Sequence, residues 1–186
     1  ILKNNILYMN FLIQLIQNYS DRYPSEKVAI TMLSFIENHT NHFSRTNHHG
    51  HFTGSAWIIN PDKTKILMTH HKKIGKWLQL GGHADGESDL LKVSQREAVE
   101  ESGINNFVTI SNEIFDMDIH EIPPIGSDPK HLHYDIRFLL QADPDKESLI
   151  ISNESHDVAW IPLDKIAHYN SEQSIMRMVD KTKILN

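Results

Sequence analysis

Three glutamates crowd into five consecutive positions of this chain, and the crowding restricts what the segment can fold into. Glu97, Glu100 and Glu101 stand at spacings of i, i+3 and i+4. On an α-helix this spacing confines the three side chains to one arc of roughly 100°. Like charges that close repel one another, so a helix that served only stability would avoid them. A hard divalent cation with oxygen ligands removes the conflict, and Mg²⁺ is the expected ion.

The apolar residues of the same segment indicate where the glutamates point. When residues 88–102 are projected as a helix, Leu90 and Val93 fall on the arc of the glutamates, whereas Lys92 and Arg96 fall on the other side. The carboxylates therefore continue an apolar stripe and are expected to line a cleft. An acidic, solvated helix face is the alternative.

Glycines bracket this helix in the sequence. Gly81 and Gly82 follow a short predicted strand over residues 77–80. Such a pair can adopt positive φ, and it lets the backbone approach a ligand closely. Gly103 is placed where a left-handed glycine ends a helix.

The whole pattern resembles the signature of the Nudix (MutT-like) hydrolases. Gly82 stands where that family has its leading glycine, and residues 96–104 fit the second half of the signature. One position differs, because the family's first glutamate, which orients the arginine, falls at Ser88 here. The resemblance implies a Nudix-type α/β/α sandwich with a mixed sheet.

The resemblance also implies roles for individual residues. Glu97, Glu100 and Glu101 would hold Mg²⁺ or Mn²⁺ together with the carbonyl of Gly81, and Arg96 would orient the glutamates by a salt bridge. The implied activity is hydrolysis of the diphosphate linkage of a nucleoside diphosphate joined to another moiety. Water would attack phosphorus in that reaction, with Glu100, Glu101 and Arg96 as catalytic residues.

Other readings of the same signature lead to other functions. A binding module that senses a nucleotide without turnover is favoured by Ser88 and opposed by the intact glutamates. An isomerase of prenyl diphosphates is disfavoured, since such enzymes use a cysteine and this chain has none. Sugar nucleotides, dinucleoside polyphosphates, ADP-ribose and damaged nucleoside triphosphates all suit the signature as substrates.

Composition excludes several classes of partner. The net charge is −6 and no run of lysine or arginine forms a stripe, which argues against bulk nucleic acid as a partner. A small nucleotide remains suitable, because a bound cation can meet its charge. The absence of cysteine fits a cytoplasmic, reducing location. No apolar run approaches the ~20 residues that span a bilayer, and no signal peptide is expected.

Residues 1–40 predict two amphipathic helices. Pro24 separates them, and Ser25 is the expected N-cap of the second. Apolar residues recur at steps of three and four in both halves, at Ile6, Met9, Ile13 and Ile16 and then at Val28, Ala29, Met32, Leu33 and Ile36. We expect a helical hairpin (residues 1–45) packed on a Nudix hydrolase domain (residues 46–186). A homodimer surface on the hairpin is the alternative.

The rest of the chain alternates between strand and helix patterns. Residues 122–129 form a proline-rich loop, and residues 171–182 predict a last helix. Strands are expected over residues 51–59, 65–69, 77–80, 107–117, 131–141 and 158–161.

Polar side chains alternate along one of these strands. His131, His133, Asp135 and Arg137 share one face, while the other face is apolar. Imidazole and guanidinium groups can contact phosphate, so His133 and Arg137 are predicted to bind substrate. A solvent-facing side of the sheet with an Asp135–Arg137 pair is the alternative.

Two further residues are candidates for the site. Glu154 lies in a polar loop before the last strand, where several Nudix hydrolases have a glutamate that serves as a metal ligand or general base. His156 is the rival base, because its ordinary pKa is near neutrality. Trp77 could stack on a nucleobase, although tryptophan in a strand more often packs in the core.

The chain has thirteen histidines, some of them at metal-ligand spacing. His48, His49 and His51 form one group, and His131 and His133 another. Imidazole is a common zinc ligand, but no H-E-x-x-H helix is present. The first group is more typical of a polar loop than of a zinc site.

Overall fold

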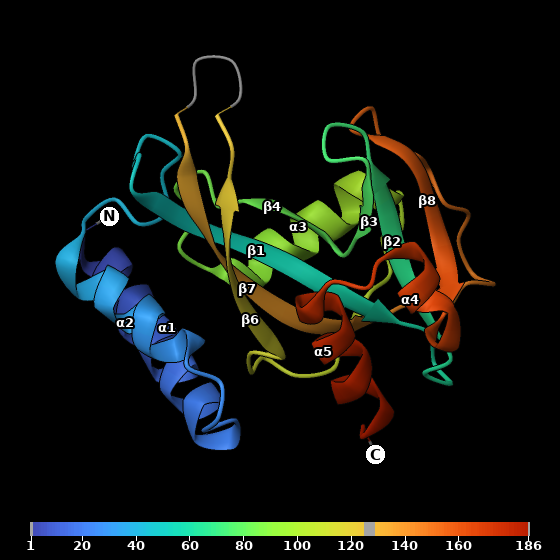
Figure 1. Cartoon of the computed structure of the whole chain (residues 1–186), viewed down its shortest axis with the longest axis horizontal. Coiled ribbons are helices and arrows are strands. Elements are labelled where there is room, and N and C mark those ends of the chain that lie inside the picture. Colours follow the sequence, from blue (N-terminus) through green and yellow to red (C-terminus); the bar gives the residue numbers. More distant parts are fainter. Residues whose placement is uncertain (1, 125–128, 186) are drawn as a thin grey trace.

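A computed structural model of the chain describes residues 2–124 and 129–185, with side chains of the first helix from Tyr8 onward. The centre of the proline-rich loop, residues 125–128, lies outside the described residues. The elements in chain order (Figure 1) are α1 (Leu2–Arg22), α2 (Val28–Asn38), β1 (Gly50–Ile59), β2 (Lys65–His71), β3 (Lys76–Leu78), β4 (Leu80–His83), α3 (Leu90–Ser102), β5 (Val108–Thr109), β6 (Asp116–Ile122), β7 (His131–Gln141), β8 (Ser155–Pro162), η1 (Leu163–Lys165), α4 (Ile166–Tyr169) and α5 (Gln173–Lys183).

Two long strands form the centre of an eight-stranded mixed sheet. β1 and β7 run parallel and pair along their whole length, whereas the other strand pairs are antiparallel. On its other edge β1 changes partner, from β4 at residues 53–56 to β2 at Ile58 and Ile59. The sheet therefore divides between β4 and β2, and Gly81 and Gly82 lie beside this division.

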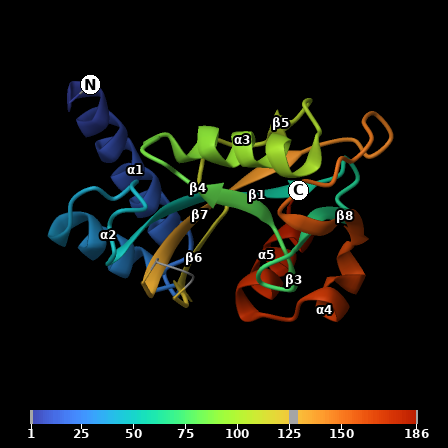
Figure 2. The same ribbon diagram turned by 90° about the horizontal axis from the view of Figure 1, so that it is seen from above.

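Helices cover both faces of the sheet, which confirms the predicted α/β/α sandwich (Figure 2). α3 packs on one face, where a side chain at Gly54 would meet Leu90 and Val93. α5 packs on the other face, where the indole of Trp57 donates a hydrogen bond to Thr182 at 2.8 Å. In the described part of the chain, no helix combines the length and the apolar character needed to cross a membrane.

The N-terminal hairpin packs against the sheet and shares its core. Phe35 of α2 stacks on Tyr134 of β7, with ring centroids 4.0 Å apart. The buried side of α1 consists of Leu12, Leu15, Ile16 and Tyr19. Of the predicted stripe, Ile16 is fully buried and Met9 packs against the core, as expected, whereas Ile13 is only half-buried and Leu12 takes its place. The side chain of Ile6 lies outside the described part of the helix. The boundary at residue 45 stays a prediction, because one core includes residues from both sides of it.

The predicted cap of α2 is also wrong. The helix begins at Val28, and Lys27 occupies the cap position without a side-chain hydrogen bond. Ser25 lies instead inside a turn that the amide of Glu26 closes on the carbonyl of Tyr23 at 2.9 Å. Proline forces the chain out of the helix, and the turn delays its return by two more residues than expected.

Two predicted strands are each divided in the structure. Residues 77–80 contribute to β3 and β4, because the chain crosses at Gln79 from one branch of the sheet to the other. Residues 107–117 contribute to β5 and to the start of β6, which continues to Ile122. β6 pairs with β7 over seven residues. Such pairing is a long-range property that local periodicity does not contain.

Candidate active site

α3 presents its glutamates to the glycines of β4. The carboxylate of Glu101 accepts a hydrogen bond from the amide of Gly81 at 2.8 Å. A Cβ atom on Gly82 would lie 2.5 Å from the carboxyl group of Glu97. Asp89 caps the start of the helix and Gly103 ends it in the left-handed conformation, with φ of 74°. The predicted direction of the glutamates, toward the protein, is confirmed for Glu97 and Glu101.

The glycine pair is required by close packing and not by backbone conformation. Neither Gly81 nor Gly82 has positive φ, which corrects one of the two roles expected from the sequence. A Cβ atom on Gly81 would lie 2.2 Å from the hydroxyl of Ser55. The two glycines therefore let β4 approach β1 closely at Gly81 and α3 closely at Gly82, where Glu97 is in direct contact. The proposed role of the Gly81 carbonyl as a metal ligand stays a prediction.

Burial and mutual repulsion make the glutamates resist ionisation. Desolvation, followed by the charges of Glu97, Glu154 and Glu100, raises the pKa of Glu101 to about 8. Desolvation also raises the pKa of Glu97, although Arg96 opposes the shift. Glu154 acts on both groups, so its loop lies close to the helix. The structure thus brings together the four glutamates that the sequence indicated.

Arg96 finds partners other than a glutamate at position 88. Its guanidinium donates to Glu97 at 2.6 Å and to the backbone carbonyl of His83 at 2.7 Å, and it lies 3.9 Å from Glu100. Although the helix projection put Arg96 on the other side, its long side chain reaches around to the carboxylates. The predicted salt bridge is present, and Ser88 does not prevent it.

Arg45 is a site candidate that sequence reasoning missed. It lies between the hairpin and β1 and makes a two-point ion pair with Asp85, which has a φ of 51° in the loop after β4. The charges of Glu97 and Glu154 contribute to raising the pKa of Arg45, so this cation faces the same cluster. A lone arginine in a polar loop gave no signal in the sequence, because its partners are distant along the chain.

The predicted substrate residues differ in their surroundings. Trp77 stacks on His70 with centroids 5.2 Å apart and an interplanar angle of 7°, and Tyr169 meets its edge. The side chain of Arg137 is 2% exposed and is enclosed by carboxylates, with Asp135 at 2.8 Å and Asp116 at 3.0 Å. The alternative reading, an Asp135–Arg137 pair, is therefore present, although buried. Substrate binding by His133, Arg137 and Trp77 stays a prediction.

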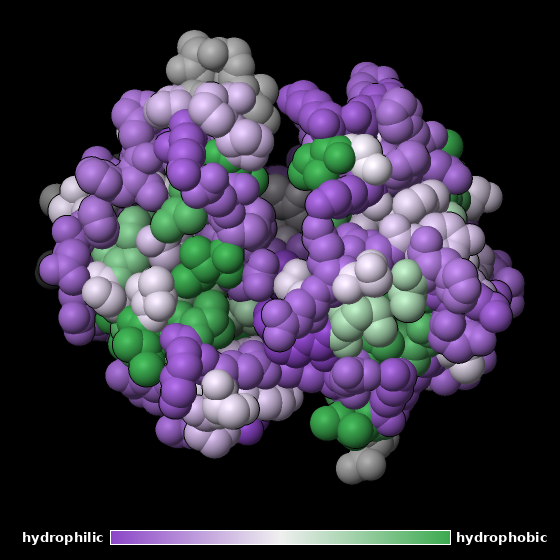
Figure 3. Space-filling view, viewed as in Figure 1, coloured by the Kyte–Doolittle hydropathy of each residue, from purple (hydrophilic) through white to green (hydrophobic). Residues whose placement is uncertain are grey.

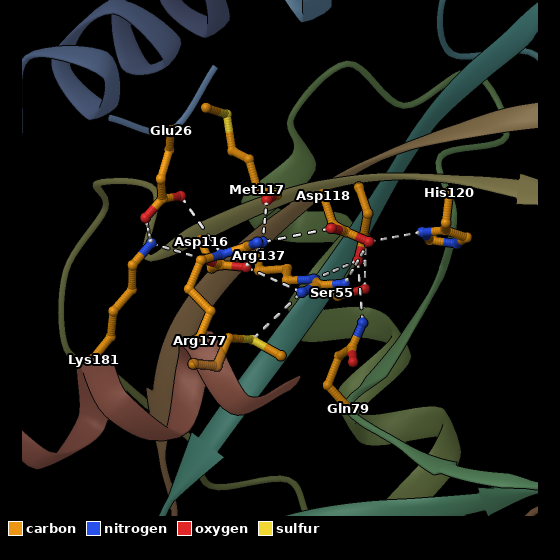
Figure 4. A network of polar contacts seen from close by, with 12 residues as sticks. Glu26, Ser55, Gln79, Asp116, Met117, Asp118, His120, Arg137, Arg177 and Lys181 are labelled. Atoms are coloured by element: carbon orange, nitrogen blue, oxygen red, sulfur yellow. Dashed lines mark hydrogen bonds and ion pairs between the residues drawn. The ribbon is translucent and has the colours of Figure 1, made fainter. Parts of the chain in front are cut away.

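Asp116 is the centre of a buried ionic network that joins three parts of the chain (Figure 4). Arg177 and Lys181 of α5 each approach its carboxylate at 2.8 Å, in addition to Arg137 of β7. The hydroxyl of Tyr19 in α1 donates to the same carboxylate at 3.2 Å. Burial opposes ionisation of Asp116, but the three cations together lower its pKa. We call this network the structural joint, because Asp116 of β6 ties α1, β7 and α5 together through Tyr19, Arg137, Arg177 and Lys181.

The chemistry of the glutamate cluster fits a magnesium-class cation. Its donors are hard carboxylate oxygens, and the buried Glu101 and the largely buried Glu97 have no matching number of cations around them. The side chain of Glu100 is 61% exposed, so the three glutamates form an open arc and not a closed cage. Mg²⁺ commonly keeps several waters and takes only one or two carboxylates plus substrate phosphates, so an open arc suits it.

Comparisons with known proteins agree with this geometry. A sequence model of the NUDIX domain matches residues 51–180. Among curated proteins, none matches the chain. Solved structures with the same fold include an Ap4A hydrolase of C. elegans in a binary complex (14% identity, 71% of this chain and 94% of that chain, TM-score 0.56) and a NUDIX-family hydrolase from Clostridium perfringens (20%, 75%, 99%, 0.54). A MutT protein from Methanosarcina mazei Go1 is a third (19%, 72%, 93%, 0.52).

Proposed function

Because the chain belongs to the Nudix family and is a diphosphate hydrolase of that family, we propose that its substrate is a nucleoside diphosphate linked to another moiety. The reaction breaks one P–O bond of the phosphoric anhydride and adds water across it. The observation that carries the proposal is the contact of Glu97 and Glu101 with the two glycines of β4, since it holds two largely desolvated carboxylates side by side without a matching number of cations.

The chain's own residues divide the work of this reaction. Glu97, Glu100 and Glu101 would hold one or more Mg²⁺ or Mn²⁺ ions with the carbonyl of Gly81. The bound cation supplies Lewis-acid polarisation of the phosphoryl oxygens and acidifies the attacking water. Arg96 fixes the direction of Glu97 through its ion pair of 2.6 Å.

A carboxylate and an arginine complete the proposal. Glu154 accepts the proton of the attacking water, since its charge already acts on Glu97 and Glu101. Arg45 lies where it can bind a phosphate oxygen that approaches the cluster. The stacked pair of Trp77 and His70 offers a flat surface to a nucleobase.

Nucleotide sensing without turnover loses the argument that favoured it. Ser88 removes the residue that orients the arginine in the family, but Arg96 is held here by Glu97 and the carbonyl of His83. All four glutamates of the cluster are present. The geometry therefore favours turnover.

A panel of diphosphates with and without Mg²⁺ tests the proposed function. It should contain ADP-ribose, a sugar nucleotide, a nucleoside triphosphate, Ap4A and dihydroneopterin triphosphate, the last two because they appear in the names of proteins with this fold. We expect turnover with Mg²⁺ or Mn²⁺ and none after chelation. Glu154→Gln should lower kcat more than it raises KM. Full turnover by chelator-stripped protein would contradict the metal assignment.

A further inference from the structure

Three histidines from two strands converge on the sheet face opposite α3. His51 of β1 pairs directly with His133 of β7, and His131 lies two residues before it on the same face. Each ring offers a nitrogen, and these three nitrogens all lie within 4.8 Å of one another. None of the three residues is used by the glutamate site.

The geometry of His131 suits a metal ligand. Its Nδ1 atom lies 2.8 Å from the carbonyl of Pro129, which can only accept, so Nδ1 carries the proton. Nε2 is therefore left with a free lone pair, held in place by the kind of backbone hydrogen bond that orients metal-ligating histidines. This Nε2 atom lies 3.3 Å from Nε2 of His133. Two nitrogens bound to one tetrahedral zinc at ~2.0–2.1 Å are about 3.3 Å apart.

His51 is buried without a hydrogen bond. It is 2% exposed, and neither Nδ1 nor Nε2 has a partner that meets hydrogen-bond geometry, although the carbonyl of Asn47 lies near the ring. Leaving such groups unpaired in the interior is costly. Its ring lies 4.9 Å from the rings of both His131 and His133, so its nitrogens face the cluster.

Hydrogen bonding alone accounts for only part of this arrangement. An N–H···N bond between His133 and His131 would explain their contact of 3.3 Å, but it leaves His51 without a partner. A cation that accepts lone pairs from three rings satisfies all of them.

The electrostatic setting keeps the rings neutral, as metal binding requires. Desolvation, followed by repulsion from neighbouring histidines, lowers the pKa of His133 to about 2. Desolvation likewise lowers the pKa of His51, and it lowers that of His83 to about 4. The His83 ring lies 4.9 Å from that of His133, so it is a neighbour of the three rings and not one of the converging ligands.

Negative charge lies next to the cluster. His120, whose ring centroid is 5.4 Å from that of His133, contacts the carboxylate of Asp118 at 3.4 Å. Asp118 belongs to the buried network, in which four carboxylates (Glu26, Asp116, Asp118 and Asp135) face three cations (Arg137, Arg177 and Lys181). Asp118 lies at the edge of this network, 22% exposed, and so keeps negative charge on the side of the histidines.

We propose that His51, His131 and His133 bind one zinc-class divalent cation, with water as the fourth ligand. Imidazole suits Zn²⁺ and not Mg²⁺, whereas the carboxylates of α3 suit Mg²⁺, so an excess of Mg²⁺ should occupy the glutamates and leave the histidines to Zn²⁺. The cation joins the starts of β1 and β7 at the loop end of the β6–β7 hairpin, where Ile122 pairs with His131. Figure 3 shows a recess beside this hairpin on the same face of the molecule. His133 acts here as a metal ligand in place of the direct substrate contact predicted from its strand position.

Titration of chelator-treated protein with Zn²⁺ in excess Mg²⁺ tests the proposal. We expect one Zn²⁺ per chain, a rise in melting temperature, and the visible spectrum of a tetrahedral site when Co²⁺ replaces Zn²⁺. His131→Ala and His51→Ala should each weaken binding at least about 100-fold. His168→Ala, which removes an exposed histidine of α4, is the matched control and should bind as the wild type does.

Two outcomes overturn the proposal. One is wild-type protein that takes up no Zn²⁺, or variants that bind it unchanged. The other is loss of Zn²⁺ binding in Glu101→Gln, which would place the ion among the glutamates. Circular dichroism checks that the variants fold. If His51→Ala fails to fold, Zn²⁺ binding by His131→Ala tests the proposal, because His131 is half-exposed and its loss should perturb the fold less. The readout is binding, so an inactive protein would refute the proposed function and leave this inference standing.

Discussion

Carboxylates gather at two places in this molecule, and their surroundings are opposite. On α3, burial and neighbouring glutamates raise the pKa of Glu97 and Glu101, and Arg96 at Glu97 and the Gly81 amide at Glu101 compensate only in part. At the centre of the sheet, Asp116 is completely buried, yet two arginines and a lysine lower its pKa. The same chemical group is thus strained in one region and satisfied in the other.

Both regions contain buried carboxylates, so residue type does not tell the functional group from the structural one. The degree of charge compensation does. A buried carboxylate whose charge is matched within the chain stabilises the fold, and it has nothing left to offer a ligand. A buried carboxylate whose charge is unmatched costs stability and attracts a cation from solution. Substitutions that remove one charge at each place should therefore have opposite consequences.

Removing a charge from α3 should give the largest effect, and on activity alone. Glu101→Gln deletes a charged ligand without changing shape, so we expect kcat to fall by about 10²–10³-fold or more. The melting temperature should hold or rise, because the repelled carboxylate is gone. Steady-state kinetics with Mg²⁺ and thermal melts measure the two. Glu37→Gln, on the exposed side of α2, is the control and should change neither. A near-normal rate in Glu101→Gln would end the metal-site assignment.

Removing the charge of Asp116 should do the reverse. Asp116→Asn leaves Arg137, Arg177 and Lys181 buried without their shared partner, so we expect a loss of about 3–5 kcal/mol in the free energy of unfolding. Urea titration measures it, and activity assayed well below the transition should stay near that of the wild type. Asp143→Asn, in the loop after β7, serves as the control. An unchanged urea midpoint would show that the network is not a structural joint.

The two regions should also respond oppositely to pH in metal-free protein. The folded pKa of Glu101, about 8, exceeds its ordinary value of 4.5, so between these values the folded chain binds a proton that the unfolded chain has lost. The free energy of unfolding should therefore fall as pH rises through this window, by up to about 5 kcal/mol across all of it. The lowered pKa values of Asp116 and Asp118 act only on the acid side, where stability is lost as pH falls below about 4.

Unfolding titrations at several pH values check this expectation. Glu101→Gln should flatten the slope above pH 5, and Mg²⁺ should stabilise the wild type more as pH rises, because it binds the ionised form. A wild-type slope that survives in Glu101→Gln would assign the proton to another group.

Arg45 should give the smallest effect. Its side chain is 59% exposed, so its charge is screened by solvent. We expect Arg45→Ala to raise KM roughly 5-fold, with kcat and stability almost unchanged. Arg22→Ala is the matched control, because it removes an arginine that pairs with Glu113 and not with the glutamates of α3. Equal kinetics for the two variants would exclude Arg45 from the site.

Local patterns predicted one of the two regions well. The arc of Glu97, Glu100 and Glu101 follows from helical spacing, and the adjoining glycines mark where a strand passes close by. Gly103 ended the helix as expected. These features lie within a few residues of one another, so the sequence contains them.

The other region could not be predicted from local patterns. Asp116 meets partners in α1, β7 and α5, and only the folded sheet brings those segments together. Arg137 was predicted to line the substrate site because its position in the strand shows which face of the sheet it lies on. That position does not show which other elements cover this face. The histidine cluster is similar, because the register of β1 against β7 decides that His51 faces His133.

The joint at Asp116 has a consequence for how the chain is made. The hydroxyl of Tyr19 also bonds Lys181, which lies 162 residues later. At a synthesis rate of about 5–20 residues per second, the first helix waits roughly 8–32 s on the ribosome before its last partner exists. Until then Tyr19 and Asp116 can meet before Arg177 and Lys181 have been made. The Asp116 carboxylate would then be buried with only one of its three cations. Completion of this network is therefore one of the last events in the synthesis and folding of the chain.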